Sequence, residues 1–231
     1  MLSGRLSGAV QRINPSVPYH ALQQAVKEVE RIHSPELLAN NEAFHRLLTE
    51  GVKVSYSQDG SERGDLVWLI DFANPENNEF IVANQFTVIE NDQNKRPDIV
   101  LFVNGLPLVV VELKNAIDEN TTLKSAYQQL ETYKHTIPSL FTYNALLVIS
   151  DGLEAKAGSL SAGLSRFMVW KSADGKSEVK TVEDLQAAES AMRTSAKRVQ
   201  SIIKQSLPEK EATQLLDVLD NMVPAQRVFA N

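Results

Sequence analysis

Residues 97–114 read PDIVLFVNGLPLVVVELK, two apolar runs separated by Asn104-Gly105. Asn-Gly is the dipeptide that best suits a two-residue type I′ turn, in which both central residues have positive φ. The flanking runs are rich in Val, Ile and Leu, which is typical of strands that are buried on both faces. The stretch therefore predicts two adjacent antiparallel strands.

Charged residues lie at the outer ends of both predicted strands. Asp98 opens the first, and Glu112 and Lys114 close the second. Because side chains alternate along a strand, Glu112 and Lys114 should share one face. A metal held by carboxylates can activate water and offset charge on a phosphate, so an acid pair beside a lysine is a candidate catalytic group. A turn Asp and a solvated Glu-x-Lys edge is the alternative, and on spacing alone it is the commoner outcome.

The pairing register of the two strands distinguishes these interpretations. A two-residue loop pairs Val103 with Leu106. Asp98 then faces Val111, and Glu112 points to the other face of the sheet. A three-residue loop, or one bulge in either strand, instead sets Asp98 opposite Glu112, within reach of a shared metal. A catalytic role therefore predicts the longer loop or the bulge.

Upstream of the hairpin, apolar residues recur at helical spacing over residues 18–31 and 40–51, which predicts that two amphipathic helices open the domain. The segments DLVWLIDF (65–72) and EFIVANQFTVIEN (79–91) are rich in β-branched and aromatic residues. They predict two strands joined by the polar loop ANPENN.

Downstream, residues 121–134 predict a helix that ends near Pro138, and NALLVIS (144–150) predicts a buried strand. Together they indicate a helical crossover back into the sheet. RFMVWK (166–171) predicts a further strand before the turn SADGK, and the chain beyond Thr181 has helical character. The expected fold is α/β, with a mixed central sheet flanked by helices over residues 1–180 and a helical extension over 181–231.

The composition limits the functions that the chain can have. At 231 residues it can bury one substantial core, and it has no apolar run long enough for a membrane helix. Its first residues lack the apolar stretch of a signal peptide, so we expect no secretory signal and a cytoplasmic protein. The absence of cysteine means that any metal is held by oxygen or histidine. The net charge of −6 argues against a protein that binds nucleic acid by bulk electrostatics. A nuclease of this composition needs only a local cationic track.

Residues 84–116, NQFTVIENDQNKRPDIVLFVNGLPLVVVELKNA, are followed by AYQQLETYKHTIPSLFTYNALLVISDG at 126–152. Together they resemble the N-terminal nuclease region of the R (restriction) subunit of bacterial type I restriction enzymes, within the PD-(D/E)xK or RecB-like superfamily. The resemblance implies a restriction-endonuclease-like fold. It also implies that Asp98 and Glu112 bind Mg²⁺, and that Lys114 orients or activates the attacking water and steadies the phosphate.

Three further residues are candidates through the same resemblance. Gln129 and Tyr133 match a QxxxY element, which implies an auxiliary pair that contacts the site or the DNA backbone. Their i, i+4 spacing places them on one helix face, and plain helix packing is the alternative, which for Tyr133 alone is the commoner outcome. Glu42 occupies a place where many nucleases of this fold carry another acid, although we favour a solvated or capping role for it.

The resemblance implies Mg²⁺-dependent cleavage of duplex DNA without sequence preference, after ATP-driven translocation by a motor of the parent enzyme. It implies modification and specificity subunits as partners. Trp170 stands where a phosphate loop ending in Gly175-Lys176 needs its first glycine, so this chain is not expected to bind ATP. We expect a fragment of a longer polypeptide. A docking or scaffold module of the restriction complex, and a freestanding repair or defence nuclease, remain alternatives.

Overall fold

The computed structural model describes residues 1–114, 122–151 and 154–169. The chain divides into two compact units. The first contains nearly all of the described elements and consists of Met1–Glu112, Tyr127–Ile149 and Ala157–Met168. The second consists of Leu113–Ala126, Ser150–Lys156 and Val169–Asn231. The predicted boundary near residue 180 and the helical extension over 181–231 lie outside the described residues.

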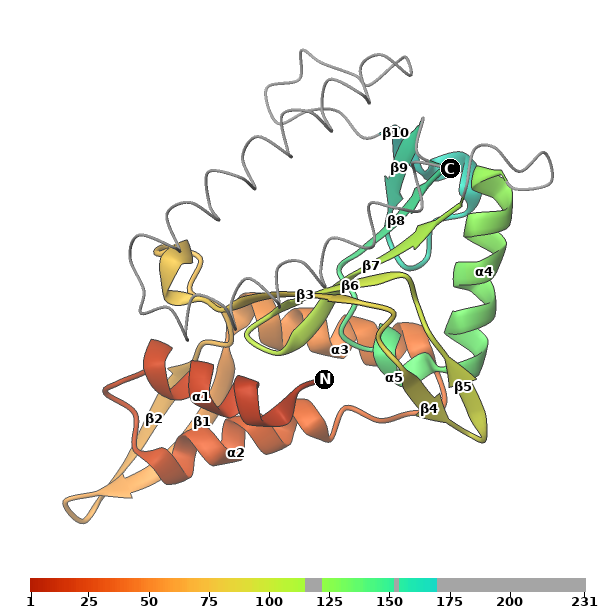
Figure 1. The fold of residues 1–231 in the computed structure, drawn as a ribbon. Coiled ribbons are helices and arrows are strands. Elements are labelled where there is room, and N and C mark those ends of the chain that lie inside the picture. The colour runs from red at the N-terminus through yellow and green to blue at the C-terminus, as the bar shows by residue number, and fades with distance from the viewer. Residues whose placement is uncertain (115–121, 152–153, 170–231) are drawn as a thin grey trace, which may run out of the picture. The chain divides into compact units, whose positions relative to one another are not determined.

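Three helices open the chain (Figure 1): α1 Ser3–Ile13, α2 Tyr19–Glu30 and α3 Leu37–Glu50. The second and third confirm the two predicted helices, and the expectation that only two open the domain was wrong. Gly4 and Gly8 lower the helix propensity of α1, and this helix was therefore not predicted from the sequence. Leu6 and Val10 are fully buried one turn apart, so packing of this stripe outweighs the glycines.

A mixed sheet of six strands forms the centre of the fold, in the order β10-β9-β8-β7-β6-β3. Its strands are β3 Phe80–Asn84, β6 Ile99–Val103, β7 Leu106–Leu113, β8 Leu146–Ser150, β9 Ala155–Gly158 and β10 Met168–Val169. β6 pairs antiparallel with both β3 and β7. The Ala145 N–H donates to the Leu108 carbonyl at 2.7 Å, and the Lys114 N–H donates to the Ser150 carbonyl at 2.8 Å, so β7 and β8 run parallel. This arrangement confirms the predicted α/β fold of restriction-endonuclease type.

Two small hairpins supplement this sheet: β1 Val52–Gln58 with β2 Ser61–Val67, and β4 Val88–Glu90 with β5 Gln93–Lys95. The predicted strand over 65–72 was therefore only partly right, because the ladder ends at Val67. Beyond it, Asn14 takes the place of a neighbouring strand. Its side chain accepts a hydrogen bond from the Trp68 N–H at 2.8 Å and donates to the Trp68 carbonyl at 2.9 Å.

The predicted strand over 79–91 is two strands. Gln85 interrupts it with a φ of 51°, in the left-handed region, and β4 then joins the second hairpin instead of the central sheet. The carboxylate of Glu90 accepts hydrogen bonds from the Ser139 hydroxyl at 2.7 Å and the Ser139 N–H at 3.1 Å. Ser139 belongs to α5 Pro138–Phe141, so this hairpin is attached to the crossover segment.

The turn between β6 and β7 has two residues, with φ of 53° at Asn104 and 81° at Gly105, as a type I′ turn requires. Only glycine fits at the second position, because a Cβ there would lie 2.6 Å from the Leu2 carbonyl oxygen. The predicted hairpin is confirmed. Since the loop is the short one, the register must be corrected elsewhere if Asp98 is to face Glu112.

A β-bulge in β7 makes this correction. Leu101 pairs with Val109 but Phe102 pairs with Pro107, which leaves Leu108 as the extra residue. The carbonyl of Leu108 accepts one hydrogen bond from the Ala145 N–H and another from the buried Asn144 side chain at 3.2 Å. The bulge that a catalytic role predicts is therefore present, and Asn144 stabilises it.

The Asn144 backbone is held by α3. Its carbonyl accepts hydrogen bonds from the Asn41 amide at 2.7 Å and from the His45 ring at 2.9 Å. His45 thus has a structural role, with Nε2 as the donor because a carbonyl oxygen only accepts. The crossover helix α4 Leu123–Thr136 and the strand β8 confirm the elements predicted between residues 121 and 150.

The end of the described chain departs from the prediction. Of RFMVWK, only Met168 and Val169 form a described strand, and Arg166 lies in the 3-10 turn Leu164–Arg166. Residues 170–171, the SADGK turn and the helices beyond Thr181 lie outside the described residues. β9 was not expected, because Ala-Lys-Ala-Gly lacks the β-branched residues that mark strands.

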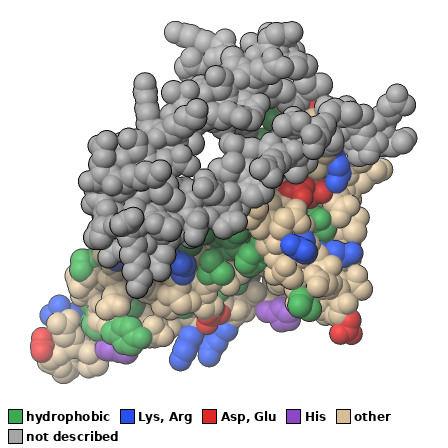
Figure 2. Space-filling view, viewed as in Figure 1, with side chains coloured by type: hydrophobic (Ala, Val, Ile, Leu, Met, Phe, Trp, Pro, Cys, Tyr) green, Lys and Arg blue, Asp and Glu red, His purple; other side chains and the backbone are tan. Residues whose placement is uncertain are grey.

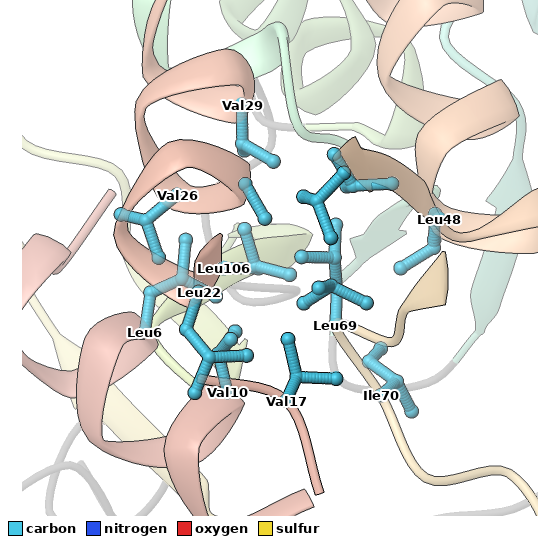
Figure 3. Close-up of a cluster of buried hydrophobic side chains, with 14 of the residues drawn as sticks. Leu6, Val10, Val17, Leu22, Val26, Val29, Leu48, Leu69, Ile70 and Leu106 are labelled. Atoms are coloured by element: carbon cyan, nitrogen blue, oxygen red, sulfur yellow. The ribbon is translucent and has the colours of Figure 1, made fainter. Parts of the chain in front are cut away.

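A hydrophobic cluster joins the N-terminal helices to the start of β7 (Figure 3). Leu106, the first residue of β7, is fully buried in it together with Leu6 of α1 and Val29 of α2. The turn before Leu106 is fixed from the same side, because the Leu2 N–H donates to the Gly105 carbonyl at 2.8 Å.

None of the helices in the described ranges combines the length and apolar character needed to cross a bilayer.

Asn144→Ala should lower the free energy of unfolding by about 1–3 kcal/mol, because it removes a buried donor to the Leu108 and Leu146 carbonyls. Urea unfolding followed by circular dichroism measures the change. The exposed Asn94, substituted in the same way, should change stability by less than about 0.5 kcal/mol. Equal stability of the two variants would contradict a role for Asn144 at the bulge.

Candidate active site

Asp98 immediately precedes β6 and is half-buried. Gln85 binds it twice: the Gln85 N–H donates to the Asp98 carbonyl at 2.8 Å, and the Gln85 amide Nε2 donates to Asp98 Oδ1 at 2.8 Å. The backbone bond lies one residue beyond the Asn84–Ile99 pair that ends the β3–β6 ladder. Both the backbone and the carboxylate of Asp98 are therefore held in place.

Glu112 lies in β7 and is 3 % exposed. Because of the bulge, Ile99 pairs with Val111, and continuing this register by one residue sets Asp98 opposite Glu112. Residues directly opposite each other in an antiparallel pair have Cβ atoms about 4.5–5.5 Å apart. The structure thus brings the two predicted metal ligands together, although a two-residue turn alone would have separated them.

Tyr133, on α4, is the third member of the group. It is 5 % exposed, and its hydroxyl donates to the carbonyl of Arg96 at 3.4 Å, two residues before Asp98. Burial raises the pKa of the Tyr133 phenol, the negative charge of Glu112 raises it further, a side-chain hydrogen bond with Gln129 lowers it, and Asp98 raises it again. The charges of both carboxylates therefore affect the pKa of the Tyr133 phenol.

Gln129 lies one turn before Tyr133, and their hydrogen bond confirms that they share a face of α4. The ring of Tyr133 also belongs to a buried stripe of the helix, with Ala126 and Leu130. The helix-packing alternative is thus correct for the ring, whereas the hydroxyl faces the acids. The structure brings four of the predicted residues into one group: Asp98, Glu112, Gln129 and Tyr133.

Lys114 and Glu42 remain to be located. Lys114 directly follows β7 and belongs to the second unit, in which its N–H donates to the Ser150 carbonyl. Its catalytic role stays a prediction. Glu42 lies on the surface of α3, its side chain 76 % exposed, 3.4 Å from Arg46 in an i, i+4 ion pair. This is the solvated role that we favoured for it.

The donor set fits a magnesium ion. Two carboxylates at this separation repel each other unless a cation lies between them or one is protonated. Mg²⁺ prefers oxygen ligands and commonly binds through one or two carboxylates, with water and substrate phosphate completing its coordination. Within the described ranges no group of three or more His, Asp and Glu side chains forms a complete metal cage.

Two residues that shape the site were not predicted. Gln85 orients Asp98, and the only signal in the sequence is the polar pair Asn84-Gln85 that interrupts an otherwise apolar segment. Asn144 stabilises the bulge, and nothing in the sequence distinguishes it from an ordinary turn asparagine. Both act through contacts between residues far apart in the chain.

On the part of the described surface that is visible in Figure 2, Lys and Arg side chains lie among residues of other kinds. The net charge of −6 argues against tight binding of DNA by bulk electrostatics.

Glu112→Gln should lower the pKa of Tyr133, and Asp98→Asn should lower it less, because Glu112 has the larger effect. A raised folded-state pKa favours the neutral phenol. The contribution of this raised pKa to the free energy of unfolding is present below about pH 10, the pKa of an unfolded tyrosine. It is lost as the pH rises through the pKa that Tyr133 has in the folded protein. NMR of Cζ-labelled tyrosine against pH measures both shifts. Tyr143, whose pKa is raised by burial and by Glu30, is the internal control and should not respond.

Comparison with known proteins identifies the family of the chain. Residues 2–166 match the family model described as type I restriction enzyme R protein N terminus. The type I restriction enzyme HindI endonuclease subunit of Haemophilus influenzae is 44% identical over 175 residues, 75% of this chain and 17% of that protein. The putative MjaIXP endonuclease subunit of Methanocaldococcus jannaschii is 37% identical over 186 residues, 79% of this chain and 18% of that protein.

A shorter match is to the SauCOLORF180P endonuclease subunit of Staphylococcus aureus, 36% identical over 120 residues, 50% of this chain and 12% of that protein. The matched part of this chain thus spans less than a fifth of the length of these relatives. The family match includes Asp98, Glu112, Lys114 and the helix that carries Gln129 and Tyr133. The chain therefore belongs to the family of type I restriction enzyme R protein N-terminal regions.

Proposed function

We propose that this chain is the metal-dependent nuclease part of a type I restriction enzyme and hydrolyses phosphodiester bonds of duplex DNA. The observation that carries the proposal is the register of β6 and β7. An extra residue at Leu108 turns a geometry that would separate Asp98 from Glu112 into one that sets them opposite each other. If Asp98 and Glu112 were only solvated residues at strand ends, the sheet would not need this bulge to bring them together.

In this proposal Asp98 and Glu112 hold a Mg²⁺ ion. When bound, the ion would lower the pKa of a coordinated water and offset charge on the phosphate. Lys114, two residues beyond Glu112 in the sequence, is assigned to orient the attacking water and steady the phosphate. A lysine suits this task because its ammonium group is a compact cation with three donors.

Gln129 and Tyr133 are assigned to hold the substrate backbone or a water beside the acids. A tyrosine phenol with an ordinary pKa of about 10 is already protonated at neutral pH, and the pKa of Tyr133 is raised further, so its hydroxyl is a neutral hydrogen-bond donor close to two carboxylates. A neutral donor can bind a phosphate oxygen without competing with the metal for the acids. The hydrogen bond between the two side chains limits their freedom before substrate arrives.

We further propose that the longer polypeptide of this family supplies an ATP-driven motor and acts with modification and specificity subunits. The net charge of −6 supports a nuclease to which DNA is delivered and which does not search for it. In this proposal the nuclease has no sequence preference of its own.

In the assembled restriction complex, Glu112→Ala and Lys114→Ala should each reduce Mg²⁺-dependent cleavage of supercoiled plasmid by about 100-fold or more. Binding of the same plasmid should change little, because the groups act on the reacting phosphate. Nicking by the 231-residue chain alone is measured in parallel, and it should be weak and equally sensitive to both substitutions.

Exposed residues of α2 provide matched controls: Glu28→Ala for the acid and Lys27→Ala for the base. Both should leave cleavage within about twofold, since neither lies in the group around Tyr133. Full cleavage by a complex that carries Glu112→Ala would reject the catalytic assignment. Loss of subunit assembly in that variant would favour a docking module instead.

A further inference from the structure

Gln85 adopts a backbone conformation that glutamine ordinarily avoids. Its φ of 51° lies in the left-handed region, where the Cβ of any residue other than glycine is crowded. The ring of the following residue, Phe86, packs edge-to-face on Phe102 of β6 with centroids 5.2 Å apart. A non-glycine residue held in this region beside a candidate site indicates a function that outweighs the strain.

The strained backbone lets Gln85 hold both parts of Asp98. The backbone N–H donates to the Asp98 carbonyl, and the side-chain amide donates to Asp98 Oδ1, each at 2.8 Å. The amide must present its NH₂ group here, because an ionised carboxylate only accepts. One residue therefore fixes where Asp98 lies in the ladder and how its carboxylate is rotated.

A neutral amide suits this task better than a cation. Lysine or arginine at position 85 would pair with Asp98 and compete with a metal for its negative charge. Glutamine orients the carboxylate and leaves the charge in place. Carboxylates that bind metals are commonly oriented by such partners, whose loss lowers metal affinity by about 10–100-fold.

We infer that Gln85 is a positioning residue that directs the Asp98 carboxylate toward Glu112 for divalent-metal binding. The inference rests on the proposed nuclease function, and assigns Gln85 no contact with metal or substrate. Its left-handed backbone allows both bonds to Asp98 to form. Neither the backbone bond nor the side-chain bond alone would set both position and rotation.

Two substitutions separate this role from a merely structural one. Gln85→Gly removes the amide and relieves the left-handed strain, so its melting temperature should be equal to or above that of the unsubstituted protein. Gln85→Leu removes the amide and keeps the strain. Both should weaken Mn²⁺ binding by about tenfold or more and raise the Mg²⁺ concentration needed for half-maximal cleavage. Asp59→Gly is the matched control, since it relieves a φ of 55° in the β1–β2 hairpin.

The measurements are made on the full-length polypeptide. Mn²⁺ binding is followed by electron paramagnetic resonance, and the relevant sites are those that Glu112→Gln removes. Weaker binding in both Gln85 variants, with Asp59→Gly unchanged, supports the inference. Unchanged Mn²⁺ affinity in Gln85→Gly and Gln85→Leu, when Glu112→Gln abolishes binding, overturns the inference but not the proposed function. If Glu112→Gln removes no Mn²⁺ site, the proposed function fails and the inference fails with it.

Discussion

The carbonyl of Leu108 is the group on which the geometry of the candidate site depends. It belongs to the extra residue of β7, and it accepts two hydrogen bonds from the segment that leads into β8. Because side chains alternate along a strand, one extra residue moves Glu112 to the opposite face of the sheet. Asn144, which provides one of these bonds, is held in turn by Asn41 and His45 of α3. A helix near the start of the chain is thereby coupled to the register of a central strand.

The same geometry places charge where a stable fold would avoid it. Glu112 is almost fully buried in a strand that is otherwise apolar, and removing a carboxylate from water is costly unless it is compensated. Asp98 adds a second negative charge opposite it, and both raise the pKa of Tyr133. Natural sequences break the rules of core composition mainly at functional sites, where the chemistry requires it.

Backbone irregularities occur on both sides of Asp98. On one side β3 is followed directly by Gln85 in a left-handed conformation, and on the other β7 contains the bulge at Leu108. Each changes how a carboxylate is presented, whereas regular pairing would satisfy the sheet equally well. Both irregularities therefore lie beside the candidate site, in a chain whose family is named for a restriction enzyme subunit.

The sequence alone determined the features that depend on local physics. Asn104-Gly105 specified the hairpin, and helical spacing located α2 and α3. The charges of Asp98 and Glu112 at the ends of apolar strands indicated a candidate catalytic group, and the role of metal ligand came from the family resemblance. Only the tertiary structure decided what depends on distant partners. It showed that α1 forms, because burial of its apolar residues outweighs the low helix propensity of its glycines. It also showed that β2 ends where the Asn14 side chain replaces a neighbouring strand. It also decided the register, since bulged and regular pairings satisfy the same apolar pattern, and contacts from Asn144 and α3 select between them.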